Sequence, residues 1–127
     1  HRMHKEWLKV DEALVQLVNR TRRNGNRVVG VGTTVVRALE TASQNDQLVP
    51  FEGETDLYIY PGYRFRSVDV LLTNFHLPRS SLLIMVSAFS GIDRIRVAYE
   101  HALKQRYRFF SYGDCMIVNR TEHLDEV

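Results

Sequence analysis

The segment VGVGTTVVRALET, which begins at position 29, ends an apolar run in glycine and continues with the pattern of a helix. The start of a helix has unpaired backbone N–H groups and the positive end of the helix dipole, which together attract anions. Gly30 and Gly32 allow a ligand to approach the backbone, and Thr33 and Thr34 add hydroxyl groups. Because no complete dinucleotide or P-loop motif is present, the pattern fits either a ligand site or a tight turn capped by threonine.

Arg37 and Glu40 follow one helical turn apart on the polar face of this helix. They either pair at the surface or, if they lie above the carboxyl ends of the strands, hold an anionic group and a hydroxyl or amine. The spacing alone leaves both readings open. The opposite face is predicted to pack on the core through Val35, Ala38, Leu39 and Ala42.

TNFHLP, from position 73, places Asn74 and His76 at the end of an apolar strand. An imidazole there could transfer protons near neutral pH, or it could make a structural hydrogen bond. Neither the five histidines nor the single cysteine, Cys115, forms a metal-binding pattern, so we expect no metal site.

RYRFFSYGD, from position 106, interleaves arginines with aromatic residues. Arg106, Arg108 and Tyr112 could contact phosphates and stack on bases of RNA. Equally, the two phenylalanines could be core residues, with Asp114 accepting backbone hydrogen bonds in the adjacent turn.

Turn and cap signals divide the chain into alternating strands and helices. Asp11 is the expected N-cap of a helix that stops at Gly25, and residues 44–55 are expected to form a loop. Strands are predicted over 6–10, 27–32 (buried), 56–60, 67–75 and 115–118, and the later helices over 33–43, 80–91 and 93–106. This alternation predicts an α/β fold with a mixed, partly parallel sheet and covering helices.

The 127 residues are enough for one domain, either complete or a piece of a larger one. The hydrophobic fraction of 44% includes no run of membrane-spanning length. The single cysteine excludes an intrachain disulfide and fits a cytoplasmic protein. The start HRMHKEW has neither an initiator methionine nor a signal-peptide pattern, which suggests a fragment.

Several blocks in their order resemble the C-terminal part of the S-adenosylmethionine:tRNA ribosyltransferase-isomerases, a bacterial family of queuosine biosynthesis. These blocks are MHKEW, VGTTVVRALE, IYPGYRFRSVDVLLTNFHLPRSSLLIMVSAFSG and AYEHALKQRYRFFSYGDCMIV. The resemblance spans about residues 3–118 and implies that residues 1–127 belong to the larger α/β domain of that family. The family's N-terminal portion and inserted β-barrel are then missing.

The resemblance implies a tRNA-modifying enzyme that uses S-adenosylmethionine as a ribosyl donor, without a metal. Such an enzyme transfers and isomerises the ribosyl group onto a 7-aminomethyl-7-deazaguanine at the tRNA wobble position. The products are epoxyqueuosine-tRNA, adenine and methionine. The implied partners are the precursor tRNA and the missing N-terminal portion, and this piece alone is expected to be inactive.

The same chemistry suggests roles for individual residues. His76 is the candidate acid or base with Asn74 beside it, and Glu40 would hold a hydroxyl. The cofactor would contact Gly32, Thr33, Thr34 and Arg37. Residues with a weaker assignment are His4, Glu6 and Asp114, and tRNA would contact Arg106, Arg108 and Tyr112.

Two other functions compete with this one. One is a non-catalytic RNA-binding or assembly fragment of the same enzyme. The other is a methyltransferase, which the sequence disfavours because the longer glycine pattern and an acidic ribose partner are not evident.

Overall fold

A capped helix follows the first strand, as the sequence predicts. In the computed structural model, which describes residues 5–121, strand β1 (Glu6–Val10) leads through Asp11 into helix α1 (Glu12–Arg23). The Asp11 carboxylate accepts a hydrogen bond of 2.9 Å from the Leu14 amide. Gly25 lies just beyond the helix with a φ of 76°, a left-handed conformation that favours glycine and ends the helix.

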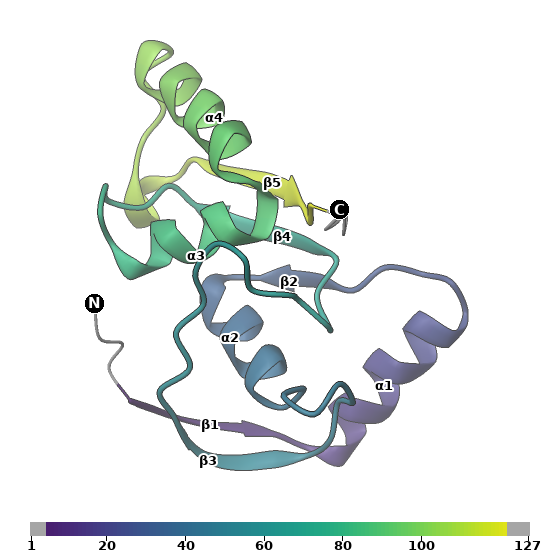
Figure 1. Ribbon diagram of the computed structural model, residues 1–127. Helices are drawn as coiled ribbons and strands as arrows, with labels where there is room; N and C mark the ends of the chain where they lie inside the picture. Colours follow the sequence, from purple (N-terminus) through teal and green to yellow (C-terminus); the bar gives the residue numbers. More distant parts are fainter. Residues whose placement is uncertain (1–4, 122–127) are drawn as a thin grey trace.

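Two small sheets organise the described residues (Figure 1). Strand β1 pairs antiparallel with β3 (Phe51–Thr55) in a two-stranded sheet. The other sheet has the order β2-β4-β5 and consists of β2 (Val29–Val31), β4 (Val70–Asn74) and β5 (Cys115–Asn119). Strands β2 and β4 are parallel, and β5 is antiparallel to β4, so the predicted mixed α/β sheet is confirmed.

Helices connect and cover these strands. Helix α2 (Thr33–Thr41) follows β2, helices α3 (Ser81–Ser90) and α4 (Ile92–Lys104) follow β4, and the short 3₁₀ helix η1 (Phe110–Tyr112) precedes β5. The ends of α2, α3 and α4 agree with the predicted helices within two residues, and η1 was not predicted. Within residues 5–121, no helix is long and apolar enough to cross a membrane.

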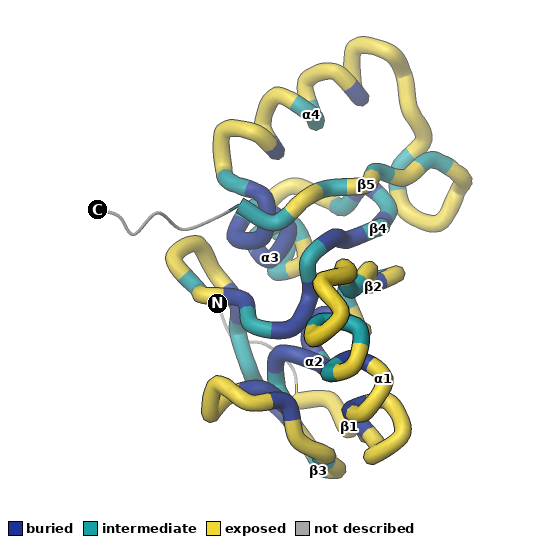
Figure 2. The backbone as a smooth tube through the Cα atoms, turned by 90° about the vertical axis from the view of Figure 1, so that its right-hand side faces the viewer, coloured by how far each residue is buried: buried dark blue, intermediate teal, exposed yellow. Residues whose placement is uncertain are grey.

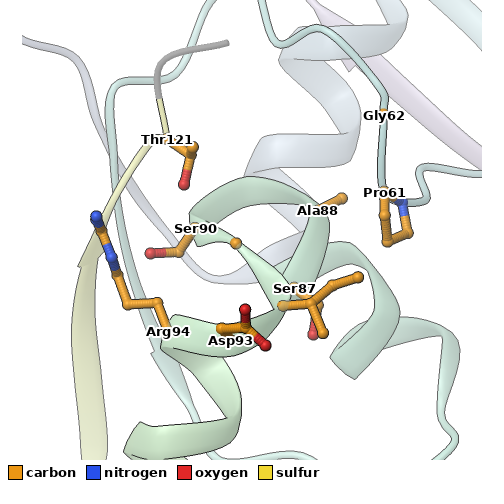
Figure 3. A pocket seen from close by; sticks show the side chains of 10 residues that line it. Pro61, Gly62, Ser87, Ala88, Ser90, Asp93, Arg94 and Thr121 are labelled. Carbon is orange, nitrogen blue, oxygen red and sulfur yellow. The ribbon is translucent and has the colours of Figure 1, made fainter. Parts of the chain in front are cut away.

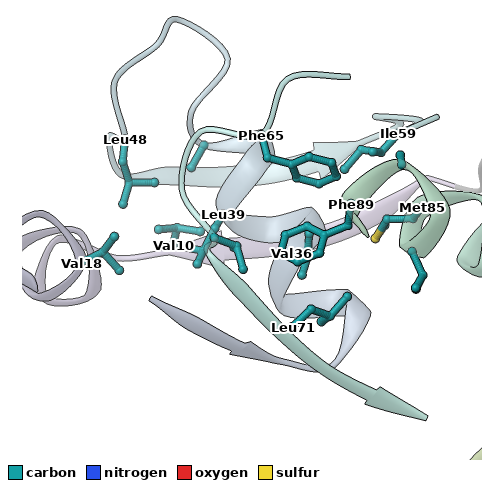
Figure 4. Packing of buried hydrophobic residues seen from close by; sticks show 14 of the residues in the cluster. Val10, Val18, Val36, Leu39, Leu48, Ile59, Phe65, Leu71, Met85 and Phe89 are labelled. Carbon is teal, nitrogen blue, oxygen red and sulfur yellow. The ribbon is translucent and has the colours of Figure 1, made fainter. Parts of the chain in front are cut away.

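One apolar cluster joins both sheets to α2 and α3 (Figure 4). Val36 from α2, Leu71 from β4 and Phe89 from α3 are inaccessible to solvent. Phe65 meets Phe89 edge to face, with ring centroids 5.0 Å apart. The yellow stretches of Figure 2 show that α4, in contrast, is exposed along most of its length.

The strand predicted over residues 56–60 is wrong, because the strand lies just before it, at β3. The predicted loop over 44–55 concealed β3, since Pro50 and Gly53 are typical turn residues. Pairing with β1, more than 40 residues away in the sequence, forms this strand. The following segment still contributes the buried side chain of Ile59 to the core.

Two predicted surfaces also differ from the structure. In β2 only Gly30 is buried, while Val29 and Val31 are 55% and 63% exposed, so the predicted buried strand is wrong. In α2, Val36 enters the core in place of Val35, which is 39% exposed. The helix is therefore rotated relative to the prediction, which brings part of its polar face into the interior.

Candidate functional site

The carboxyl ends of β2 and β4 meet at one edge of the three-stranded sheet. Their parallel register aligns Val31 with Leu72, and the Gly32 amide donates a hydrogen bond of 2.8 Å to the Leu72 carbonyl. Because β5 is antiparallel, its first residue, Cys115, lies beside Asn74 at the same edge. Ligands of α/β proteins bind at such an edge.

The start of helix α2 is open at this edge. Gly32 is the N-cap with φ 96° and ψ 149°, a conformation that residues with a side chain rarely adopt. A Cβ atom at Gly32 would meet no atom within 4 Å. No side chain caps the helix, and Thr33 is half-buried while Thr34 is exposed. The junction therefore presents free helix amides and two hydroxyls, as the sequence reasoning required of a ligand site.

His76 lies just after β4 and is held from two sides. Its Nε2 is 2.9 Å from the hydroxyl of Thr73, and its backbone amide donates to the Tyr99 hydroxyl at 2.8 Å. Partial burial lowers the pKa of His76 below its ordinary value, since burial disfavours the charged imidazolium. The imidazole is thus neutral at neutral pH and can accept a proton.

Asn74 and Asp114 meet at the same edge. The Asn74 amide donates to the Asp114 carbonyl at 3.2 Å. The Asp114 carboxylate accepts hydrogen bonds from the backbone and side chain of Arg108, and these lower the pKa of Asp114. The predicted turn role of Asp114 is confirmed, and the pairing ties Arg108 to the edge.

The segment before β5 separates the two phenylalanines that the sequence grouped as possible core residues, because Phe110 is 42% exposed and the core alternative is wrong for it. Phe109 packs against Phe75 and Tyr99, with ring centroids 5.3 and 5.8 Å apart, so this phenylalanine belongs to an aromatic cluster. Arg106 and Tyr112 are exposed, the latter at 72%. An RNA contact through the exposed members stays a prediction.

Arg37 lies inside the protein, between α2 and the two-stranded sheet. Its guanidinium donates to the carbonyl of Leu57 at 3.0 Å and of Thr55 at 3.3 Å, and it forms an ion pair with Glu6. The side chain is 4% exposed. Arg37 thus binds a carboxylate of its own chain, which argues against a second carboxylate from a ligand at the same guanidinium.

Glu40 is completely buried and holds the segment that precedes β4. Its carboxylate accepts hydrogen bonds from the amides of Arg66 and Ser67 at 2.9–3.1 Å and from the Tyr63 hydroxyl at 3.1 Å. Burial, together with the Glu40 charge, raises the pKa of Tyr63 to about 12. This geometry makes Glu40 a structural anchor and argues against the predicted contact with a ligand hydroxyl.

The structure therefore divides the predicted site residues into two groups. The sheet edge, defined here as Gly32, Thr33, Thr34, Asn74, His76 and Asp114, is brought together by strand pairing. Arg37, Glu40 and Glu6 belong to buried or partly buried networks elsewhere, and His4 lies outside the described residues.

Sequence reasoning missed Thr73 and Tyr99, the two residues that hold His76. Thr73 stands three residues before His76, so a local hydrogen bond could have been considered. Tyr99 belongs to α4, and no signal in the sequence connects it to this strand end. No group of three or more acidic, histidine or cysteine side chains within residues 5–121 could hold a metal ion.

The mixed sheet with covering helices places the chain in the class of α/β proteins, whose ligands commonly bind at the carboxyl edge of the sheet. The family model described as queuosine biosynthesis protein matches residues 1–118. The chain therefore belongs to the queuosine biosynthesis protein family.

Two similar proteins share one name, S-adenosylmethionine:tRNA ribosyltransferase-isomerase. The chain is 63% identical over 118 residues to the S-adenosylmethionine:tRNA ribosyltransferase-isomerase of Stenotrophomonas maltophilia, covering 93% of this chain and 34% of that protein. The Coxiella burnetii protein of the same name is 54% identical over 119 residues, with coverages of 94% and 35%. The chain thus spans about a third of the length of these relatives.

A solved structure is also similar. The S-adenosylmethionine tRNA ribosyltransferase of Thermotoga maritima is superimposed with a TM-score of 0.83 and 50% identity. The match covers 87% of this chain and 40% of that one.

Proposed function

We propose that this chain is the C-terminal part of an S-adenosylmethionine:tRNA ribosyltransferase-isomerase. The observation that carries the proposal is the 63% identity, over 93% of the chain, to a relative of that name. The reaction transfers and isomerises the ribosyl group of S-adenosylmethionine onto 7-aminomethyl-7-deazaguanine at the tRNA wobble position. Epoxyqueuosine-tRNA, adenine and methionine are the products, and the tRNA substrate implies a cytoplasmic reaction.

The exposed apolar surface of the sheet supports a place within a larger α/β domain. Val29 and Val31 of β2 and Ile117 of β5 are 55–69% exposed. Val31 and Ile117 flank Leu72 in the register, so they form one apolar row across the sheet. Exposed rows of this kind usually mark a contact surface. We assign this surface to the N-terminal two-thirds of the enzyme, and the chain alone is inactive.

The sheet edge supplies groups that suit the cofactor. Helix amides and the hydroxyls of Thr33 and Thr34 would contact the ribose or the methionine carboxylate of S-adenosylmethionine. Gly32 would allow close approach, since no atom lies within 4 Å of its missing side chain. Binding at these positions would hold the sugar at the same sheet edge as the histidine.

His76 would remove the proton that the adjacent sulfonium makes acidic. Its lowered pKa keeps the imidazole neutral and able to accept this proton, and the hydroxyl of Thr73 fixes the ring. Asn74, held by the Asp114 carbonyl, would orient the substrate. The exposed Arg106 and Tyr112, with Arg108, would contact the tRNA.

Mass spectrometry of precursor tRNA tests the proposal. The intact enzyme that contains this chain, incubated with S-adenosylmethionine, should add a ribosyl-derived mass and release adenine. A methyl-sized gain would overturn it. His76→Ala should reduce turnover about a hundredfold, whereas the exposed His101→Ala should not.

Calorimetry with S-adenosylmethionine distinguishes the proposed catalytic function from that of a non-catalytic RNA-binding or assembly fragment. The intact enzyme should bind the cofactor, and Thr33→Val should weaken this binding. An intact enzyme that binds tRNA but not S-adenosylmethionine would favour the non-catalytic alternative.

A further inference from the structure

The turn between α3 and α4 leaves the start of a long helix open. Gly91 ends α3 by donating its amide to the Ser87 carbonyl at 2.8 Å, and the same residue is the N-cap of α4. Its φ of 101° is accessible mainly to glycine. No side chain caps α4, which has 13 residues. The amides of its first turn and the positive end of its dipole therefore attract an anion.

Two buried hydroxyls without partners lie beside this helix start. The side-chain oxygens of Ser90 and Thr121 are buried and accept or donate no hydrogen bond. Ser90 is 1% exposed as a whole residue. Figure 3 shows both hydroxyls pointing into the space that they share with Arg94. Because an unpartnered buried hydroxyl lowers stability, its presence at a helix start points to a missing ligand.

The backbone fixes both hydroxyls in this position. The Thr121 amide donates to the Phe89 carbonyl at 2.8 Å, which holds Thr121 against the end of α3. Its hydroxyl lies 3.3 Å from the point where a Cβ of Gly91 would be, so glycine leaves room for it. The Phe89 and Ser87 carbonyls already accept hydrogen bonds, and neither one takes the proton of a hydroxyl.

The local charge also favours an anion. Arg94 lies in the first turn of α4 and forms no ion pair with any residue in the 5–121 range. Asp93 also lines the hollow, but its side chain is 90% exposed and paired with Arg96, so its negative charge is partly neutralised. The hollow has a volume of about 400 Å³, and Pro61 and Gly62 form its opposite wall.

We infer that this hollow between α3 and α4 binds a phosphate group. The Ser90 and Thr121 hydroxyls, the first amides of α4 and the Arg94 guanidinium are all hydrogen-bond donors to its oxygens. The phosphate belongs either to an RNA backbone or to a free phosphate ion. An RNA phosphate at this site rests on the proposed tRNA-modifying function, whereas binding of a free phosphate ion does not.

A titration of the 127-residue chain with inorganic phosphate tests the site. At constant ionic strength, the amide resonances of Gly91, Ile92 and Asp93 should shift and saturate. Arg94→Gln should weaken binding about tenfold, because a charge-assisted hydrogen bond is lost. The matched control is Lys104→Gln, which removes an exposed cation from the last turn of the same helix. Shifts that do not saturate, or equal weakening in both variants, would overturn the inference.

Ser90→Ala gives a second readout that a purely structural hydroxyl would not produce. In phosphate-free buffer the variant should melt at a higher temperature, because it removes an unpartnered buried hydroxyl. Added phosphate should then raise its melting temperature less than that of the unchanged chain. A lower melting temperature without phosphate, together with an unchanged phosphate response, would contradict the assignment.

The salt dependence of tRNA binding distinguishes the two sources. If an RNA phosphate occupies the hollow, Arg94→Gln should reduce the slope of log K against log salt by about one, and Lys104→Gln should not. A saturable phosphate titration with an unchanged tRNA slope would assign the hollow to free phosphate and overturn the RNA source alone. That result would leave the proposed function intact.

Discussion

Helix α2 presents two regions of opposite character within nine residues. At its start, Gly32 and Thr34 leave backbone amides and a hydroxyl open at the sheet edge. One and two turns further on, Arg37 and Glu40 are buried, and each makes several hydrogen bonds within the chain. The spacing left Arg37 and Glu40 open between a surface pair and a ligand contact, and only the family resemblance suggested ligand roles for them beside Gly32 and Thr34.

The difference lies in what packs beside each part of the helix. Beside Arg37 and Glu40 the chain folds back, through residues 55–57 and 63–67, and supplies carbonyls, amides and a hydroxyl that satisfy both charges. At the helix start, in contrast, a side chain at Gly32 would meet no atom within 4 Å, and Thr34 is exposed. A polar helix face thus becomes a structural network where the chain returns to cover it, and a candidate site where it does not.

The largest expected effect concerns the buried end. Glu40→Gln places an amide NH₂ against backbone N–H donors and removes the charge that they stabilise, so we expect about 3 kcal/mol less stability. Urea denaturation of the 127-residue chain measures the change. Glu52→Gln, at an exposed position of β3, is the control and should cost almost nothing. A loss as small as that of the control would return Glu40 to the list of ligand-binding candidates.

The second-largest effect is expected for Arg37→Lys, which should lower the free energy of unfolding by about 2 kcal/mol. Lysine keeps the charge but cannot reach the Leu57 carbonyl, the Thr55 carbonyl and the Glu6 carboxylate at once. Urea denaturation is again the measurement, with the exposed Arg23→Lys as control. If Arg37→Lys kept full stability but impaired cofactor binding by the intact enzyme, the predicted ligand role would be correct.

Gly32→Ala tests the open end and should cost about 1.5 kcal/mol, from backbone strain alone. The added methyl group meets no atom within 4 Å, so no packing cost is expected. The neighbouring Thr34→Ala is the control, since its side chain is exposed. A loss comparable to that of Glu40→Gln would mean that the junction is closely packed, contrary to the comparison.

The smallest effect is a pH dependence at His76. Burial lowers the pKa of His76 in the folded chain, so the unfolded chain binds the proton more readily. This contribution to stability is complete above the ordinary pKa of 6.5 and declines as the pH falls from there toward the lower folded pKa. His76→Gln should flatten the dependence of stability on pH between about 5 and 7, and the exposed His101→Gln is the control. An unchanged slope in His76→Gln would contradict burial of the ring.

Local signals predicted most of the helices. The cap at Asp11 is formed as expected, and Gly91 ends α3 as predicted. Ser80, predicted as the first residue of its helix, is instead the N-cap of α3. Strand β3 was missed because only its pairing with β1 makes Phe51–Thr55 a strand. Pro50 before the strand and Gly53 within it are typical turn residues, so the sequence predicted a loop there.

The candidate site was predictable in part for the same reason. Asn74 ends an apolar strand and His76 lies two residues beyond it, so their place at a strand end could be inferred. Their alignment with Gly32 required the parallel pairing of β2 with β4. The contact of His76 with Tyr99 required α4 to return over the strand end.

The sequence by itself determined the Asp11 cap, the glycines that end α1 and α3, and the order of strands and helices, because these depend mostly on neighbours within one or two helical turns. Tertiary structure decided which polar residues face solvent and which become internal anchors. Burial depends on segments distant in the chain, and only their packing supplies the partners that make a buried charge such as Glu40 stable.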